Sequence, residues 1–399
     1  MTDPRLARGY RRAAAAFAVG CALAAAAVRL PQLDVFLTPD ETRWACRSTN
    51  FYHALAAGDL AATYQKEHPG VVTMWLGGLG QPIDDTADWR VACRDIDPSD
   101  LVAEAPRPAL DEITARLFRG RQRVALFVSL CVGLMTWLVG RLLGHRVALL
   151  AGLVIALEPF FVAHGRVLHL DGVTTSLMTL SLLWLLLWLH RGRRRRDLLL
   201  SGAMAGLAAV NKSPALILAG IAGLLVAADA MAARRPRSWR AVPPLVGPVA
   251  RDVVAPLAMW GAAATAAYVV VWPAMWLAPI DVLRNVLGGA ESYAEQGHEG
   301  GNYFWGRPVL DPGPAFYPVA WALRTSPVAM IGLALAAWCG WRGRRGAGSD
   351  PSSPSPRAAS ILLALVAYAV LFALVMTGGA KKFDRYLLPV FPALDIVAA

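Results

Sequence analysis

Residues 173–196, VTTSLMTLSLLWLLLWLHRGRRRR, decide the fold class. The run from 173 to 190 carries no Asp, Glu, Lys or Arg. At helical rise it is close to the roughly 20 residues that cross a bilayer. Arginines follow it directly, at position 191 and at positions 193–196. An apolar run that ends in arginines is typical of a transmembrane helix whose next loop stays in the cytoplasm.

Similar apolar runs recur along the whole chain of 399 residues. The composition, 56% hydrophobic and 17% charged with a mean hydropathy of +0.44, excludes an ordinary soluble protein. We therefore expect an all-α polytopic membrane protein in which residues 1–399 form a single transmembrane domain. The candidate spans are 13–30, 124–140, 147–163, 173–190, 198–211 (short), 214–231, 253–272, 326–341, 359–377 and 387–399.

The arginines predict the orientation of this bundle. If all ten spans are real, the arginine-rich segments fall on one side, which the positive-inside rule identifies as the cytoplasm. The net charge of +11 is then a topological signal. It does not indicate nucleic-acid binding, because arginines divided among separate loops form no continuous basic face. The arginine-rich segments are 5–12, 141–146, 191–196, 234–240 and 342–357.

The opposite side receives two long loops, residues 31–123 and 273–325, which we expect to carry interfacial helices. Transporters usually have short loops and often internal repeats, and we find no repeat in this sequence. These features favour an enzyme whose site lies at the outer face of a bacterial plasma membrane. The chain stops at Ala399 within an apolar run, which suggests a C-terminal truncation.

The cysteines and histidines give weaker signals. Cys46 and Cys93 both lie in the first outer loop, an oxidising compartment, and can form a disulfide. No Cys or His pair has the spacing of a metal site, so no metal ligands are assigned.

Asp40 and Glu41 follow the first span directly. Adjacent carboxylates cannot share one face of a helix, so one can point into a site while the other binds a neighbour. The functional interpretation is a general base for an acceptor group, with a divalent cation as a further option. The structural interpretation is a helix start in which Thr38 or Asp40 is the N-cap.

Four further polar motifs lie on the same predicted side, and each also has a plain structural interpretation. His68 begins a segment that resembles an interfacial helix. Arg166 and Asp171 can form an interhelical ion pair, and Lys212 can extend its amine to the interface. The stretch 381–389, KKFDRYLLP, brings four charges next to an apolar run, where charge is costly and usually functional. The convergence of all five motifs on one side favours a site.

In their order along the chain, these motifs resemble the GT-C membrane glycosyltransferases. The resemblance is to glycosyltransferase family 39, with the protein O-mannosyltransferases and the aminoarabinose transferases of lipid A as relatives. The matching motifs are Asp40-Glu41, His68-Pro-Gly-Val-Val-Thr-Met-Trp75, Arg166-x-x-x-x-Asp171-Gly, Asn211-Lys212-Ser-Pro214, Asp311-Pro-Gly-Pro-Ala-Phe-Tyr317-Pro and Lys381-Lys-Phe-Asp-Arg385-Tyr-Leu-Leu-Pro389.

The resemblance implies a GT-C-like helix bundle that transfers a sugar, with inversion, from a polyprenyl-phosphate donor to an acceptor protein, lipid or glycan. It implies that Asp40 is the general base and Glu41 its companion. It places Arg166, Asp171, Lys212, Lys381 and Arg385 at the donor phosphate or sugar. Further candidates are His68, Lys382 and Tyr386.

One departure from the family concerns the acceptor. The protein mannosyltransferases have a second proline where this chain has Gly70, which weakens the case for a protein acceptor. Two other functions remain open. A lipid-linked sugar flippase or other transporter would use the same cations without chemistry and would gain nothing from Asp40. A membrane assembly factor would need none of these residues.

Overall fold

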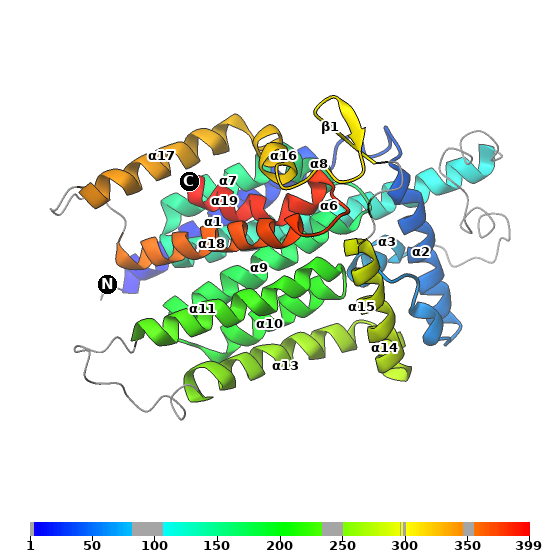
Figure 1. Ribbon diagram of the computed structural model, residues 1–399, viewed down its shortest axis with the longest axis horizontal. Coiled ribbons are helices and arrows are strands. Elements are labelled where there is room, and N and C mark those ends of the chain that lie inside the picture. Colours follow the sequence, from blue (N-terminus) through cyan, green and yellow to red (C-terminus); the bar gives the residue numbers. More distant parts are fainter. Residues whose placement is uncertain (1–3, 82–106, 234–249, 296, 298–300, 346–354) are drawn as a thin grey trace.

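The computed structural model describes residues 4–81, 107–233, 250–295, 297, 301–345 and 355–399. Within them the chain is a bundle of roughly parallel and antiparallel helices (Figure 1). The bundle helices are α1 (Pro4–Arg29), α6 (Arg107–Leu143), α7 (His145–Leu157), α8 (Pro159–His164), α9 (Leu170–His190), α10 (Arg195–Ala209), α11 (Ile217–Ala233), α13 (Ala255–Val270), α17 (Pro327–Arg345), α18 (Pro356–Thr377) and α19 (Phe391–Ala398).

The fold class predicted from the sequence is confirmed, but the number of spans differs. Among the described residues, five helices are long and apolar enough to cross a membrane, or six if the bent pair α16 and α17 forms one span. The apolar run 147–163 is broken at Glu158 and Pro159 into α7 and α8. The run 387–399 is divided between a 3-10 helix, η4 (Asp384–Val390), and α19.

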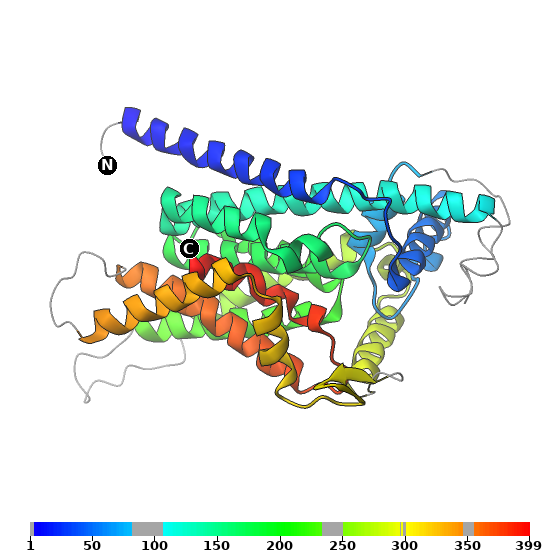
Figure 2. The ribbon, with the colours of Figure 1, turned by 90° about the horizontal axis from the view of Figure 1, so that it is seen from above.

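The helix α9 lies at the centre of the bundle and contains the stretch that decided the fold class. It packs against α6, α10, α11 and η4, and almost all of its side chains are buried. A helix that is apolar on every side is stable only when neighbours cover it completely. Figure 2 shows α1 and α6 on one side of the bundle and α17 and α18 on the other.

Two glycines allow close contact between the helices α10 and α13. A Cβ atom added to Gly202 would lie 2.3 Å from the carbonyl oxygen of Trp260. One added to Gly206 would lie 2.0 Å from the carbonyl oxygen of Ala264. The GxxxG spacing therefore lets the two backbones touch, as is common between helices in membranes.

The two long loops carry helices, as predicted, and they lie at the end of the bundle opposite the N-terminus (Figure 1). The first has α2 (Pro39–Ala56), the 3-10 helix η1 (Ala61–Thr63) and α3 (Val71–Gly78). The second has α14 (Ala274–Leu277), α15 (Pro279–Glu295) and α16 (Phe316–Arg324). A 3-10 helix, η2 (Ser213–Leu216), and a π-helical turn, η3 (Ala250–Val254), begin α11 and α13.

Two details of the loops differ from the sequence prediction. Residues 107–123, assigned to the first loop, are the first part of the long helix α6, which extends beyond the bundle (Figure 1). The second loop includes an antiparallel hairpin of β1 (Asn302–Phe304) and β2 (Arg307–Val309), a small exception to an all-α chain. Cys46 is buried on α2, whereas Cys93 lies outside the described residues, so their pairing stays a prediction.

The predicted sidedness can be measured with single cysteines in a Cys339→Ser background, because Cys339 is an exposed free thiol. Tyr303 on β1 and Arg194 between α9 and α10 are both exposed. We expect Tyr303→Cys to react with a membrane-impermeant maleimide on intact cells, and Arg194→Cys to react only after lysis. The reverse pattern would place the loop end in the cytoplasm.

Candidate active site

The start of α2 separates the two adjacent carboxylates into different surroundings. Glu41 has no exposed surface and accepts hydrogen bonds from the Thr38 hydroxyl (2.9 Å) and from the backbone N–H of Leu168 (2.8 Å). Its carboxylate also pairs with the buried guanidinium of Arg121 on α6, where Nε lies 2.6 Å from Oε1. Glu41 therefore joins α2 to α6 and to the α8–α9 connection, and it does not line the cavity described below.

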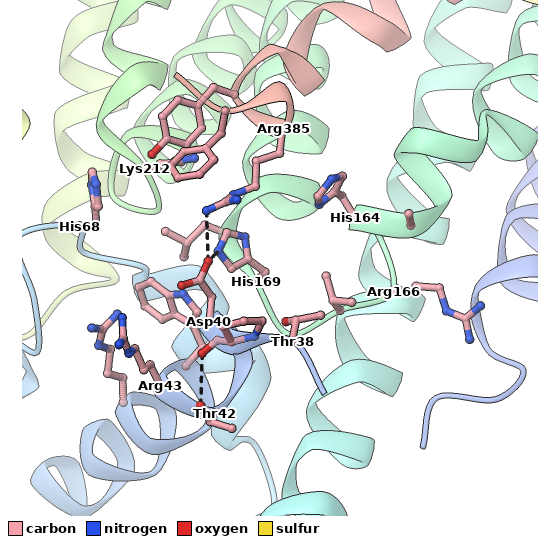
Figure 3. Close-up of a pocket in the computed structure, with 18 of the residues that line it drawn as sticks. Thr38, Asp40, Thr42, Arg43, His68, His164, Arg166, His169, Lys212 and Arg385 are labelled. Carbon is pink, nitrogen blue, oxygen red and sulfur yellow. Dashed lines mark hydrogen bonds and ion pairs between the residues drawn. The ribbon is translucent and has the colours of Figure 1, made fainter. Parts of the chain in front are cut away.

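Asp40 points the other way, into a cavity (Figure 3). Its Oδ2 lies 3.1 Å from Nη2 of Arg385 and 3.4 Å from Nε2 of His169. The hydrogen bond from His169 lowers the pKa of Asp40 to about 2, and the charges of His169 and Arg385 add to this while burial opposes it. Asp40 is therefore an ionised carboxylate held by two donors.

Asp171, at the start of α9, is the buried counterpart of Asp40. Its Oδ1 lies 2.5 Å from Nζ of Lys212, and its Oδ2 lies 3.0 Å from Nδ1 of His169 and 3.4 Å from Nε of Arg385. His169 and Arg385 thus each contact both Asp40 and Asp171. Burial alone would lower the pKa of His169, but Asp171 and Asp40 together outweigh burial and raise it.

Asn211 holds Lys212 in this position. Its Oδ1 accepts from the backbone N–H (2.9 Å) and hydroxyl (3.0 Å) of Thr73 on α3. Its Nδ2 donates to Thr174 Oγ1 (3.0 Å) on α9. The buried amide therefore fixes the α10–η2 connection against two other segments and directs the next residue, Lys212, at Asp171.

Gly70 shows why this chain lacks the second proline of the protein mannosyltransferases. It adopts a φ of +62°, which proline cannot adopt, and its N–H donates to the carbonyl of Asn211. A Cβ atom here would lie 2.1 Å from the ring of Trp44. Glycine in place of proline is thus required by the local backbone conformation. It allows α3 to pack closely against α2 and against the turn at Asn211.

The cavity has a volume of about 1570 Å³ and is strongly basic. Among the described residues that line it, Asp40 is the only carboxylate. The lining also has an apolar part, formed by residues such as Val28, Phe36, Leu157 and Val162. A cavity with a basic centre and an apolar side fits an amphiphilic anion. The basic lining residues are Arg43, Arg47, Lys66, Arg166, Lys212, Lys381 and Arg385.

The structure brings most of the predicted donor residues together, with one exception. Arg166 lines the cavity, but its guanidinium donates to the carbonyls of Pro31 and Gln32 and points away from Asp40 (Figure 3). The predicted ion pair between Arg166 and Asp171 is therefore not formed, because Lys212, His169 and Arg385 surround Asp171 instead. In this structure Arg166 holds the segment that follows α1.

The aromatic residues Tyr293 and Tyr386 support three of the other candidates. Nζ of Lys212 lies 4.2 Å from the ring centroid of Tyr386, and Nζ of Lys381 lies 4.7 Å from that of Tyr293. His68 stacks on Tyr293 with a centroid distance of 4.2 Å. Burial, together with the charges of Lys212 and Lys381, lowers the pKa of His68 to about 3. His68 is therefore a neutral imidazole at physiological pH and adds no charge to the cavity.

Lys382 lies outside the lining of this cavity. Its buried amine contacts Asp311 Oδ1 (2.7 Å) and the carbonyl of Gly379 (2.6 Å). Lys382 therefore ties the second long loop to the start of the C-terminal segment.

His169, Arg43 and Arg47 are among the residues that line the cavity but were not predicted from the sequence. His169 stands two residues before Asp171, in a connection where neither residue type nor spacing reveals that it faces Asp40. Arg43 and Arg47 follow Asp40 at i+3 and i+7, and this spacing does place them on the same face of a helix as Asp40. That signal was available once α2 was recognised as a helix.

The donor set does not favour a metal ion. Within the described ranges, no group of three or more His, Cys, Asp or Glu side chains could hold one. Asp40 and Asp171 are each paired with cationic side chains, namely Arg385 and Lys212. The network is thus suited to bind an anion.

The family comparison agrees with the resemblance inferred from the motifs. Residues 110–260 match the family model of the dolichyl-phosphate-mannose-protein mannosyltransferases. This range runs from α6 into α13 and includes Asp171 and Lys212. No curated protein matches the chain significantly.

Solved structures share the fold at low sequence identity. The chain aligns with ArnT from Cupriavidus metallidurans bound to undecaprenyl phosphate, with a TM-score of 0.59, 18% identity and coverage of 96% of this chain and 58% of that one. The apo form of that ArnT gives a TM-score of 0.54 with the same identity and coverage. The Archaeoglobus fulgidus oligosaccharyltransferase in complex with Zn and sulfate gives 0.50, with 14% identity over 96% and 48% of the two chains. This chain therefore spans just over half the length of ArnT.

The separation of Asp40 from Glu41 predicts different effects of neutralising each. Glu41→Gln leaves the buried Arg121 without its counter-charge, and breaking a buried pair costs about 3–5 kcal/mol. Asp40→Asn affects a half-exposed pair, worth about 1 kcal/mol or less. We expect thermal unfolding in nanodiscs to show a large drop in midpoint for Glu41→Gln and a small one for Asp40→Asn. Equal midpoints would contradict the structural role of Glu41.

Proposed function

We propose that this chain is a membrane glycosyltransferase that uses a polyprenyl-phosphate-linked sugar. The proposal rests on its GT-C fold, which it shares with ArnT, and on the match of residues 110–260 to the mannosyltransferase family. The sugar passes to an acceptor hydroxyl with inversion at the anomeric carbon. The loop end of the bundle, which holds the cavity, faces the outside of the membrane. The structure of ArnT contains bound undecaprenyl phosphate, which supports a donor of this chemical class.

One observation carries this proposal: a carboxylate and two cations face each other across the same cavity. Asp40 and Arg385 are in contact at 3.1 Å, and Arg385 and Lys212 share Asp171. A phosphate bound by Arg385 and Lys212 would set the attached sugar beside Asp40. An acceptor hydroxyl between Asp40 and the anomeric carbon would then have its base in place.

The cations act on the leaving group. As the bond between sugar and phosphate breaks, negative charge grows on the departing polyprenyl phosphate. Fixed positive groups stabilise that charge more in the transition state than in the bound donor. Asp171 keeps Lys212 and Arg385 in position before the donor arrives, so little reorganisation is needed during the reaction.

The contact between Asp40 and Arg385 also connects donor binding to the strength of the base. With its pKa held at about 2, Asp40 is a weak proton acceptor in the unliganded protein. A donor phosphate that draws Arg385 toward itself removes one of the charges that lower this pKa. The pKa of Asp40 then rises, which makes its carboxylate a better acceptor for the proton of the acceptor hydroxyl, while the hydrogen bond from His169 keeps the carboxylate in place.

The role of Asp40 as base predicts a catalytic defect without a binding defect. Asp40→Asn should slow transfer by about 100-fold or more, since general bases contribute 10² to 10⁴ in rate. The measurement is the rate at which membranes consume the lipid-linked sugar that accumulates when the protein is removed. The affinity for undecaprenyl phosphate should stay within about twofold. A flippase without chemistry would give Asp40→Asn the same turnover as the native chain.

The role of Arg385 predicts that a lysine cannot replace it. Lysine keeps the charge but cannot contact Asp40, Asp171 and a phosphate with one planar group. Loss of one charge-assisted hydrogen bond, worth about 1.5–3 kcal/mol, should lower kcat/KM for the donor roughly 10- to 100-fold. Arg194→Lys, at an exposed arginine between α9 and α10, is the matched control and should have no effect. Equal rates for the two variants would remove Arg385 from the donor site.

A further inference from the structure

The helix α2 lines the cavity with more than the base. Asp40, Arg43, Arg47 and Asn50 all line it, at positions i, i+3, i+7 and i+10. This spacing puts the four side chains on one face of the helix. A polar stripe therefore leads from Asp40 along α2, with two arginines directly after the carboxylate.

These arginines differ from the cations at the donor site in how their charge is balanced. Lys212 and Arg385 are matched by Asp171 and Asp40. Arg43 and Arg47 have no carboxylate partner within the part of the chain that the structure describes, and Arg47 rests on the ring of Trp44 at 4.6 Å. Like charges one helical turn apart are mutually destabilising. Burial and the charge of Arg43 lower the pKa of Arg47, and they outweigh the opposing influence of Tyr293, Asp40 and Glu67. An anion bound here would relieve the repulsion between the two arginines.

Figure 3 shows Arg43 on the side of Asp40 opposite Arg385 and Lys212. In an inverting transfer the acceptor attacks from the side opposite the leaving phosphate. With the phosphate at Arg385 and Lys212 and the acceptor hydroxyl at Asp40, the rest of the acceptor extends toward Arg43 and Arg47. An anion at these arginines thus belongs to the acceptor and not to the donor.

We propose that Arg43 and Arg47 form a second anion subsite, and that the acceptor is a phosphorylated or carboxylated glycan or glycolipid. This inference rests on the proposed function. At 1.5 Å of helical rise per residue, the anionic group would lie about 5–10 Å from the reacting hydroxyl. The subsite selects acceptors by charge, whereas Asp40 selects only for a hydroxyl.

The experiment uses the full chain in phosphatidylcholine nanodiscs saturated with undecaprenyl phosphate. Glucuronate and glucose 1-phosphate are the anionic probes, and glucose is the neutral match. Binding is measured by ligand-observed NMR. We expect both anionic sugars to bind while undecaprenyl phosphate is present, and glucose to bind at least about tenfold more weakly, because it makes no charge-assisted hydrogen bonds.

The variants separate the two anion sites. The double variant Arg43→Gln/Arg47→Gln should lower the affinity for the anionic sugars by about tenfold or more. Its affinity for undecaprenyl phosphate should stay within about twofold of that of the native chain. Arg385→Gln should lower the affinity for undecaprenyl phosphate, and Arg194→Gln should change neither affinity. Thermal unfolding of each variant checks that the fold is retained.

Four results would overturn the proposal. Equal loss of undecaprenyl phosphate affinity in Arg43→Gln/Arg47→Gln and Arg385→Gln would assign all these cations to the donor. Displacement of the anionic sugars by phosphatidylglycerol in the nanodisc would identify the arginines as a site for membrane headgroups. Absence of anionic sugar binding, with undecaprenyl phosphate bound normally, would remove the acceptor subsite and leave the glycosyltransferase proposal intact. Failure of the native chain to bind undecaprenyl phosphate would overturn both.

Discussion

The buried carboxylate of Asp171 is the interaction on which the loop end of the bundle depends. It lies at the start of the central helix α9 and contacts His169, just before that helix, and Lys212 and Arg385, which come from two other parts of the chain. A buried lysine and a buried carboxylate are each costly alone and tolerable only together. The pairing of Asp171 with Lys212 makes both buried charges tolerable. It also fixes the spacing of the cations that face the cavity.

A second pairing, between Glu41 and Arg121, determines where Asp40 can point. The hydrogen bonds of Glu41 to Thr38, Leu168 and Arg121 set the start and the orientation of α2. Successive residues of a helix are separated by about 100°, so once Glu41 faces inward, Asp40 must face the cavity. Helix geometry thus directs two neighbouring acids into different surroundings, one buried and one facing the cavity.

The charge balance of the cavity suggests how binding and reaction are ordered. At the donor end, carboxylates and cations already satisfy one another, so a phosphate must displace Asp40 from Arg385 to bind. At the other end of the α2 stripe, Arg43 and Arg47 have excess positive charge. In the proposed reaction, donor binding would therefore both fill an anion site and release Asp40, and the acceptor would approach from the end where positive charge remains.

The sequence alone determined the class of the protein and predicts the side on which its chemistry lies. Long apolar runs require helices in a bilayer, and the arginines between them predict the sidedness, since both signals depend only on local composition. The motif order also identified Asp40, Asp171, Lys212, Lys381 and Arg385, all of which contribute to the same basic site. Composition and the order of motifs can be read directly from the linear sequence.

The tertiary structure decided the partners of each charge. The residue types and their spacing do not show that Glu41 is buried against Arg121 while Asp40 faces the cavity. They also do not show that Arg166 turns toward the segment after α1 while His169 turns toward Asp40. The same holds for Lys382, which secures Asp311 of the second long loop. The ion pairs that Lys212 and Arg385 form in the site join residues that are between 41 and 345 positions apart, and their partners depend on which helices pack together. That packing is a property of the whole bundle, so the roles of individual charges became visible only when the helices were in place.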